Sequence, residues 1–360
     1  MAGCNLRLIS SLTNLAQTLT AMKNRFLKLL FISGLLLVLI HTPEAEAQHI
    51  DIRVHDPSII QQDDMYYIFN TGRGIANWAS PDMENWERLD PVFDSAPEWT
   101  FDVVEDFGNH IWAPSIIERD GTFYLYYSIS SFGRNTSAIG VATNSTLHPD
   151  DPDYEWTDHG QVVRSVPGRD LWNAIDGAPV IDHDGTPWLV FGSFWAGMKL
   201  VQLDNNMIEI AKEPQEWHTV AARHRYWKMD DRSAGNAMNS SIEAPFIFKK
   251  DNYYYLFVSW DACCRNEDST YKIVVGRSEN ITGPYLDKAG ENLAHGGGSF
   301  VLGGDGENYA AIGHNAVYTF NDTDYLIAHA YDLSDEGRSK LLIQEVEWDE
   351  HGWPVVRLSE

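Results

Sequence analysis

The sequence predicts an all-β protein, a five-bladed β-propeller, from three observations. A short apolar segment, opened four times by proline, recurs five times, and a Tyr- or Trp-rich segment follows each copy about nine residues later. Turn-forming residues separate the two segments, as is typical of β-hairpins. No long stretch shows an apolar period near 3.6 residues, so we expect helices to be short and few.

The five repeats start at regular intervals along the chain. They begin at Pro57, Pro114, Pro179, Pro245 and Val317, 57 to 72 residues apart. A period of this length with several short strands fits a propeller blade. A β-sandwich is the competing architecture for the same strand pattern. The turns inside the repeats include Arg119-Asp120-Gly121, His183-Asp184-Gly185 and Lys250-Asp251-Asn252.

Residues 1–47 precede the repeats and have the features of a secretory leader. Lys and Arg follow Met22, an apolar run continues to Ile40, and Ala45-Glu46-Ala47 resembles a cleavage site. Met22 is therefore the expected start of translation, and an uncleaved anchor helix is the alternative. The prediction is a secreted or periplasmic protein whose residues 48–360 form a single catalytic propeller domain.

The charge and the cysteines limit the kinds of partner. The formal net charge is −26, from 26 basic and 52 acidic residues, which argues against nucleic acid or an anionic membrane as partner. Three cysteines exclude a disulfide scaffold. The neighbours Cys263 and Cys264 form either a vicinal disulfide or two thiols, and the sequence leaves both open. We expect a monomer.

Ionisable residues lie where the repeats open. Asp56 opens the first repeat, Asp176 the third, Glu243 the fourth and His314 the fifth. A propeller brings the first strand of every blade to its central channel, so these side chains are expected to converge there. Burying three carboxylates costs free energy that pairing or function must offset. The alternative is that they are only turn residues that start strands.

Two carboxylates that face each other across a cleft are suited to hydrolysis of a glycosidic bond. One must be ionised and the other protonated, so their surroundings must differ. Glu243 lies among apolar residues, which predicts a raised pKa, whereas Asp56 follows His55 and is better placed to stay ionised.

An ordered set of motifs resembles glycoside hydrolase family 43, and within it most closely the endo-1,5-α-L-arabinanases. The motifs are Val54-His55-Asp56-Pro57-Ser58-Ile59, Trp112-Ala-Pro-Ser-Ile116, Asn173-Ala-Ile-Asp176, Gly192-Ser-Phe-Trp195, Ile242-Glu243-Ala-Pro-Phe-Ile247 and Gly313-His314-Asn315-Ala-Val317. The resemblance runs from about residue 50 to the C-terminus.

This resemblance implies a five-bladed propeller and single-displacement hydrolysis with inversion. It assigns Asp56 as the general base, Glu243 as the general acid, and Asp176 as the residue that orients Glu243 and adjusts its pKa. It also implies a central ion, commonly Ca²⁺, that His314 binds largely through water. Residues alone give only weak support for calcium, because Ca²⁺ prefers oxygen ligands.

The remaining site predictions concern the substrate, arabinan or its oligosaccharides. The expected contacts are His55, Trp112, Asn173, Ser193 and Trp195. The chain departs from many relatives at two positions, with Ser115 in place of an Asp and Gly177 in place of a Pro. The second departure leaves the aim of Asp176 less fixed.

Internal cleavage of α-1,5-arabinan is therefore the leading functional prediction. An exo-acting α-L-arabinofuranosidase or β-xylosidase is the close alternative, because the same fold and carboxylates support both. A sugar-binding propeller without catalytic activity is the third, and the retention of all three carboxylates argues against it.

Overall fold

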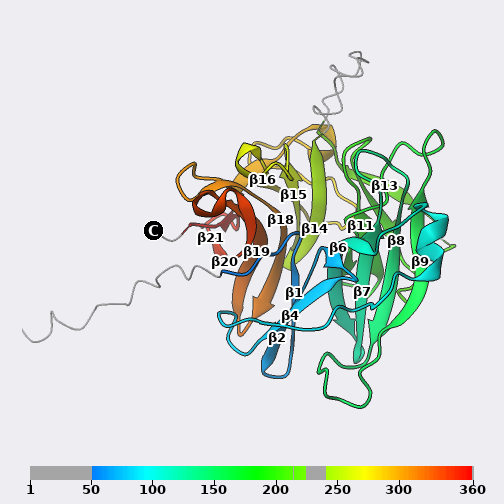
Figure 1. Cartoon of the computed structure of the whole chain (residues 1–360). Coiled ribbons are helices and arrows are strands. Elements are labelled where there is room, and N and C mark those ends of the chain that lie inside the picture. The colour runs from blue at the N-terminus through cyan, green and yellow to red at the C-terminus, as the bar shows by residue number, and fades with distance from the viewer. Residues whose placement is uncertain (1–50, 214, 224–240, 359–360) are drawn as a thin grey trace, which may run out of the picture. The chain divides into compact units, whose positions relative to one another are not determined.

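The computed structural model describes residues 51–213, 215–223 and 241–358. The predicted leader, residues 1–47 with Met22, lies outside the described residues. His49–Leu358 form one compact unit. Within the described residues the chain builds five antiparallel sheets of three to five strands in sequence order and a separate two-stranded ribbon, which confirms the five-bladed β-propeller (Figure 1).

The first two blades contain nine strands, and β3 pairs with the blade that follows it. Blade 1 has the order β1 (Ser58–Gln62), β2 (Met65–Asn70), β4 (Ala76–Ser80) and β5 (Glu87–Arg88). Blade 2 has the order β3 (Gly72–Arg73), β6 (His110–Arg119), β7 (Thr122–Ile129), β8 (Ser137–Asn144) and β9 (Thr157–Ser165).

The other three blades follow the same meander. Blade 3 is β10 (Ala178–Ile181), β11 (Pro187–Phe191), β12 (Met198–Gln202) and β13 (Trp217–Ala221). Blade 4 is β14 (Ile242–Lys250), β15 (Tyr253–Trp260), β16 (Lys272–Ser278) and β17 (Ser299–Gly303). Blade 5 is β18 (Tyr309–Phe320), β19 (Thr323–Asp332) and β20 (Arg338–Glu345).

Short elements complete the described chain. A two-stranded ribbon pairs β21 (Glu347–Trp348) with β22 (Pro354–Val355). The 3-10 helices are η1 (Glu98–Asp102), η4 (Asn266–Asp268), η5 (Leu293–His295) and η6 (Leu333–Asp335). None of the described helices is long and apolar enough to cross a membrane.

The first strands of the blades form a closed ring. Each of β1, β6, β10, β14 and β18 contacts the next, and β18 also contacts β1. The N-terminal segment joins blade 5, because the Leu341 N–H of β20 donates to the Ile52 carbonyl at 3.1 Å. This bond ties the last blade to the chain that precedes the first.

Apolar side chains fill the interfaces between neighbouring blades. A buried cluster that includes Ile59 and Ile327 joins blades 1 and 5, and another that includes Val190 and Leu256 joins blades 3 and 4. Similar clusters lie at the other three interfaces. Each buried Ile, Leu or Val side chain contributes about 1.5–3 kcal/mol to stability, so these interfaces hold the ring together.

The predicted hairpin turns are present, and three of the strands that contain the repeat starts, β6, β14 and β18, begin several residues upstream of them. Asp120 and Gly121 have φ values of 54° and 77°, and Gly185 has 84°. Strand β6 begins at His110 rather than near Pro114, and β18 begins at Tyr309 rather than near Val317. A bulge interrupts the pairing of both strands, and the ladder resumes upstream of it.

Candidate active site

Each blade places one residue with a left-handed backbone at the same point of the ring. These residues are Asp56, Ala113, Asp176, Ala244 and His314, with φ between 42° and 58°. This conformation costs a residue other than glycine about 1 kcal/mol, so its repetition in all five blades marks a conserved turn of the fold. Residues at and just after these turns enclose a central cavity of about 20 Å³, the space of about one water molecule.

Four of the five turns are held by a side chain from the end of the preceding blade's second strand. The backbone N–H of the turn residue donates to that side chain, at 2.8 to 3.0 Å. The pairs are Ala113 with Thr71, Asp176 with Ser128, His314 with Ser259 and Asp56 with His329. The last pair joins blade 1 to blade 5 and completes the circle.

The fifth turn, at Ala244, is held differently. Gly192 occupies the corresponding position of blade 3, since its N–H donates to Ile175 as the Thr71 N–H donates to His55. A side chain at Gly192 would approach the Gly197 carbonyl to 3.1 Å, at a φ of 134°. Asp176 supplies the missing acceptor, and its Oδ2 receives the Ala244 N–H at 3.1 Å. Asp176 is thereby fixed beside Glu243.

Asp56 is buried and surrounded by donors. Its Oδ1 lies 2.8 Å from His55 Nδ1 and 3.0 Å from His314 Nδ1. Burial acts to raise its pKa, but the charge of His314 and the hydrogen bonds of His314 and His55 outweigh burial and hold the pKa well below the usual value of 3.8. Asp56 is therefore ionised, in agreement with the sequence prediction.

The two oxygens of Asp56 differ in their free acceptor capacity. Thr71 accepts the Ala113 N–H, so its hydroxyl proton is directed to Asp56 Oδ2, at 2.6 Å. Oδ1 already receives two N–H groups, whereas Oδ2 receives one hydroxyl. A carboxylate oxygen accepts about two hydrogen bonds, so Oδ2 retains one position for a water molecule.

Glu243 lies in β14, one residue before the Ala244 turn, and is buried. Ser193 Oγ donates to its Oε2 at 2.7 Å, and the Tyr271 hydroxyl is also hydrogen-bonded to it. Burial raises the pKa of Glu243, and the hydrogen bonds from Ser193 and Tyr271 oppose burial only in part. The carboxyl group is therefore suited to carry a proton, as its apolar sequence context predicts.

Asp176 and Glu243 form a coupled pair. Burial raises the pKa of Asp176, His314 acts against this, and the negative charge of Glu243 raises it further. Both carboxyl groups therefore favour their protonated forms at pH values where exposed carboxylates are ionised. Bonds to Ser128 and Ala244 fix the orientation of Asp176, although the flexible residue Gly177 follows it.

His314 faces the carboxylates from blade 5. Burial acts to lower its pKa, but Asp56, Asp176 and Glu243 together raise the pKa to about 9. The three carboxyl groups therefore favour the protonated, positively charged form of His314.

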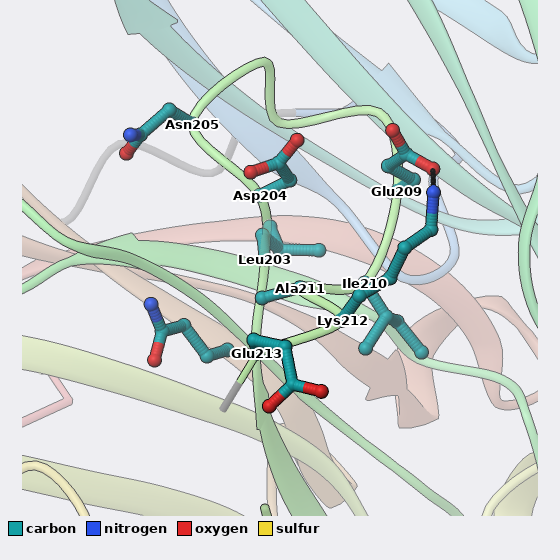
Figure 2. Close-up of a pocket in the computed structure, with 9 residues that line it drawn as sticks. Leu203, Asp204, Asn205, Glu209, Ile210, Ala211, Lys212 and Glu213 are labelled. Atoms are coloured by element: carbon teal, nitrogen blue, oxygen red, sulfur yellow. Dashed lines mark ion pairs between the residues drawn. The ribbon is translucent and has the colours of Figure 1, made fainter. Parts of the chain in front are cut away.

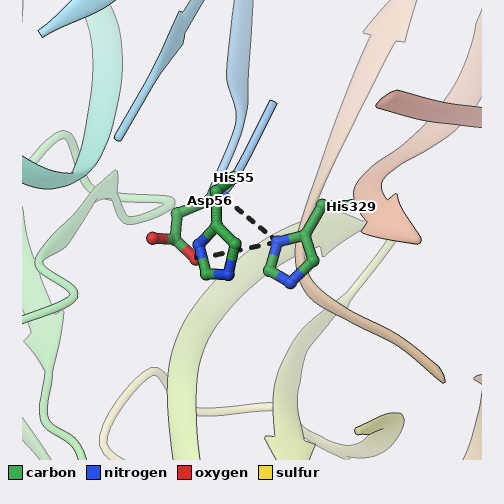
Figure 3. Close-up of side chains that lie close together, drawn as sticks. All are labelled: His55, Asp56 and His329. Carbon is green, nitrogen blue, oxygen red and sulfur yellow. Dashed lines mark hydrogen bonds and ion pairs between the residues drawn. The ribbon is translucent and has the colours of Figure 1, made fainter. Parts of the chain in front are cut away.

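A potential metal-binding group is present but is already saturated with hydrogen bonds. His55, Asp56 and His329 offer ligand atoms within 4.8 Å of one another, and Figure 3 shows Asp56 beside the two rings. His55 Nδ1 contacts Asp56, His329 Nδ1 accepts the Asp56 N–H, and both Nε2 atoms contact the Tyr331 hydroxyl. No ring lone pair of this group is left for a cation.

The central cavity offers a different donor set. His314 and Asn315 both line it, and the buried amide of Asn315 has no hydrogen-bond partner within the described residues. One carboxamide oxygen and one imidazole nitrogen do not make a complete calcium cage. They fit only an ion whose other ligands are water.

The predicted substrate contacts differ in exposure. Trp112 is half-buried next to the turn of blade 2, Trp195 is half-buried in the loop between β11 and β12 of blade 3, and His55 is also half-buried. Ser193 is buried against Glu243. Asn173 is 3 % exposed, and its amide oxygen accepts from Ser137 Oγ at 2.7 Å, so this oxygen is directed into the blade.

A second, larger pocket does not include Asp56, Asp176 or Glu243. Figure 2 shows it on the loop between β12 and β13, where Asp204, Glu209 and Lys212 are among its lining residues. It has a volume of about 290 Å³. It contains none of the predicted site residues.

The cysteine pair forms a vicinal disulfide at the edge of the site. Cys263 is bonded to Cys264, whose Sγ lies 3.8 Å from His55 Nε2. The Cys264 N–H donates to the Tyr331 hydroxyl at 2.7 Å. The loop after β15 thus contacts the residues around Asp56.

Sequence reasoning missed several residues of the site. Comparison of the repeats at the ends of their second strands would have found Thr71, Ser128, Ser259 and His329, because each follows the aromatic segment. Tyr271 and Tyr331 have no such signal. Their roles depend on side-chain directions that only the folded chain defines.

Comparisons with known proteins identify similar glycoside hydrolases. The chain is 50% identical over 305 residues to the extracellular exo-α-(1→5)-L-arabinofuranosidase ArbA of Cellvibrio japonicus, covering 85% of this chain and 86% of the relative. It is 38% identical over 305 residues to the extracellular endo-α-(1→5)-L-arabinanase 1 of Bacillus subtilis, covering 84% and 87%.

A solved structure shares the fold. The α-L-arabinanase of Cellvibrio cellulosa complexed with arabinohexaose matches with a TM-score of 0.80 and 49% identity, over 85% of this chain and 96% of that chain. The family model described as glycosyl hydrolases family 43 matches residues 50–354. The chain belongs to glycosyl hydrolases family 43.

Proposed function

We propose that the protein hydrolyses the α-1,5-L-arabinofuranosidic bonds of arabinan by single displacement with inversion. The observation that carries this proposal is the opposite perturbation of two buried carboxyl groups in one site. The pKa of Asp56 is lowered by two imidazoles, and the pKa of Glu243 is raised by burial. Glycoside hydrolysis requires an acid and a base whose pKa values are shifted in opposite directions in this way.

Asp56 acts as the general base. Its free acceptor position is on Oδ2, where a water molecule donates a proton while its oxygen attacks the anomeric carbon. His55, His314 and Thr71 hold the carboxylate in place and keep it ionised.

Glu243 acts as the general acid. It gives its proton to the glycosidic oxygen as the bond to the anomeric carbon breaks, which avoids an alkoxide leaving group. Asp176 orients it through the Ala244 N–H, and its negative charge opposes ionisation of Glu243.

Substrate contacts follow from the exposed edge of the site. Trp112 and Trp195 offer aromatic faces to furanose C–H groups, and His55 borders the position of the attacked sugar. Ser193 and Asn173 serve mainly to hold neighbouring polar groups, since both are buried.

The mode of attack has two candidates. The sequence motifs favour internal cleavage, and the B. subtilis relative has an endo-acting name. Release of sugar from chain ends is the second candidate, because the C. japonicus relative with an exo-acting name is more similar to this chain. Chromatography of early products from linear α-1,5-arabinan decides between them. Mixed oligosaccharides indicate endo attack, and a single short product from the start indicates exo attack.

A calcium ion in the central cavity is part of the proposal. Asn315 and a neutral His314 would hold it together with water, so the ion would compete with the proton that the neighbouring carboxyl groups favour on His314. Metal analysis of purified protein, with thermal unfolding before and after a chelator, tests this ion. A metal-free protein whose melting temperature does not respond to added Ca²⁺ would contradict it.

Secretion of a monomer is likewise proposed. Both curated relatives above are named extracellular enzymes. Mass spectrometry of the protein recovered from culture medium would locate the mature N-terminus near residue 48, and light scattering would give the oligomeric state.

A further inference from the structure

A closed ring of hydrogen bonds starts and ends at Asp56. The Asp56 N–H donates to His329 Nδ1 at 3.0 Å, and His329 Nε2 lies 3.2 Å from the Tyr331 hydroxyl. The same hydroxyl lies 3.0 Å from His55 Nε2, and His55 Nδ1 lies 2.8 Å from Asp56 Oδ1. Every member is supplied by this chain.

The backbone decides the proton position on His329. Because an amide N–H can only donate, His329 Nδ1 must present its lone pair to Asp56. A neutral His329 therefore has its proton on Nε2, and burial lowers its pKa well below 6.5. Its Nε2–H donates to the Tyr331 oxygen.

The Tyr331 hydroxyl transmits this constraint. Its oxygen accepts one hydrogen bond from His329 and a second from the Cys264 N–H, at 2.7 Å. A hydroxyl oxygen has two acceptor lone pairs, so the Tyr331 hydroxyl can only donate to a further neighbour. Ser269 is also hydrogen-bonded to this hydroxyl, and His55 Nε2, at 3.0 Å, can join it only as an acceptor. His55 then has its own proton on Nδ1, and this proton faces Asp56 Oδ1.

The ring is rigid as well as complete. His329 is fully buried and Tyr331 is 2 % exposed. The rings of His55 and His329 are stacked, with centroids 4.0 Å apart (Figure 3). The other polar contacts of the two imidazoles are longer, with Cys264 Sγ 3.8 Å from His55 Nε2 and Asp56 Oδ1 3.7 Å from His329 Nδ1. Stacking and burial therefore hold both rings in this orientation.

We propose that Tyr331 and His329 are positioning residues for the base, which hold His55 as the neutral tautomer with its proton on Nδ1. That N–H occupies Asp56 Oδ1 and leaves Oδ2 to receive the proton of the attacking water. The inference deepens the proposed function and rests on Asp56 as its base. In the other tautomer, a His55 lone pair would face the carboxylate and push it out of position.

The direct test is histidine tautomer NMR on protein labelled with ¹⁵N-histidine, at pH 7 and without substrate. The ¹⁵N shifts distinguish protonated from unprotonated ring nitrogens. The signals of His55 and His329 are identified by their absence from the spectra of the His55→Gln and His329→Gln variants. We expect a proton on Nδ1 of His55 and on Nε2 of His329. A proton on Nε2 of His55 would overturn the proposal.

Tyr331→Phe tests the link between the ring and catalysis. We expect His55 to lose its pure tautomer, kcat on arabinan to fall about tenfold, and KM to change less than twofold; tenfold is part of the 10²–10⁴ that a general base supplies. Tyr285→Phe is the matched control, because Tyr285 is a buried tyrosine that donates to the Ile281 carbonyl at 2.6 Å in another part of blade 4.

The outcomes separate this inference from the proposed function. If Tyr331→Phe keeps both the wild-type His55 spectrum and the wild-type kcat, the positioning role is wrong. If the wild-type protein does not hydrolyse arabinan, the proposed function fails, and the NMR measurement still decides the hydrogen-bond ring because it needs no substrate.

Discussion

The backbone N–H of Ala244 donates a hydrogen bond to Oδ2 of Asp176 at 3.1 Å. This bond connects the turns of blades 3 and 4, at the position where a glycine has replaced the side chain used by the other blades. Asp176 thus has two effects on its neighbour Glu243: it fixes the backbone beside it, and its negative charge opposes ionisation of the second carboxyl group.

Substitution of Asp176 separates these effects. Asp176→Asn keeps an acceptor for Ala244 but removes the shared charge, so Glu243 titrates alone and the alkaline limb of the kcat/KM profile moves to lower pH. Asp176→Ala also loses the acceptor, and a buried N–H without a partner costs about 1–3 kcal/mol of unfolding free energy. Urea unfolding and pH profiles of both variants test this. An alkaline limb that stays in place in Asp176→Asn would contradict the coupling.

Removal of either catalytic carboxyl group should abolish most activity. We expect Asp56→Asn and Glu243→Gln each to lower kcat on arabinan by at least 100-fold, the lower end of the range for general acid–base catalysis. Asp120→Asn is the control, because Asp120 is an exposed turn residue whose side chain is 91% accessible. Initial rates of reducing-end release measure the effect. Wild-type rates in both variants would contradict the assignment of Asp56 as the base and Glu243 as the acid.

His314 should set the pH range of the site. Its positive charge lowers the pKa values of Asp56 and Glu243. Activity requires an ionised Asp56 and a protonated Glu243, so it falls below the first pKa and above the second. His314→Gln raises both values, and both limbs of the kcat/KM profile should move to higher pH. His351→Gln, at an exposed loop, is the control. A shift of either limb to lower pH would contradict the proposed effect of the His314 charge on the two carboxyl groups.

Gly313 should be intolerant of any side chain. A Cβ there would lie 2.0 Å from Tyr271 Cδ1, and Tyr271 is hydrogen-bonded to Glu243. We expect Gly313→Ala to lower the unfolding free energy by about 1–3 kcal/mol through overpacking and to lower kcat. Gly108→Ala, where a Cβ has open space, should change stability by less than about 0.5 kcal/mol. Equal melting temperatures for the two variants would count against this packing.

The sequence was sufficient for the fold because the five repeats each carry a hairpin signal and an apolar opening. The positions of Asp56, Asp176, Glu243 and His314 could be predicted for the same reason, since a propeller brings equivalent residues to one channel. The strand starts of β6 and β18 could not, because the bulges let each ladder extend upstream of the proline or valine that marks the repeat.

The contacts around Asp56 were beyond sequence reasoning. Residues far from Asp56 in the chain form these contacts: His329 of β19 accepts the Asp56 N–H, and Tyr331 of β19 contacts His55. Cys264, in the loop after β15, donates to Tyr331. No spacing rule links them, because their meeting depends on closure of the ring between blades 5 and 1. Hydrogen-bond direction, rather than residue type, defines what they do.

Time-resolved ¹H NMR of the first product released from an α-1,5-linked arabino-oligosaccharide tests the central claim most directly. Attack of water held by Asp56, opposite a leaving group protonated by Glu243, inverts the anomeric carbon. The β-anomer should therefore appear first, and the α-anomer only later through mutarotation. Initial formation of the α-anomer would show retention and contradict the assignment of Asp56 as a base that activates water.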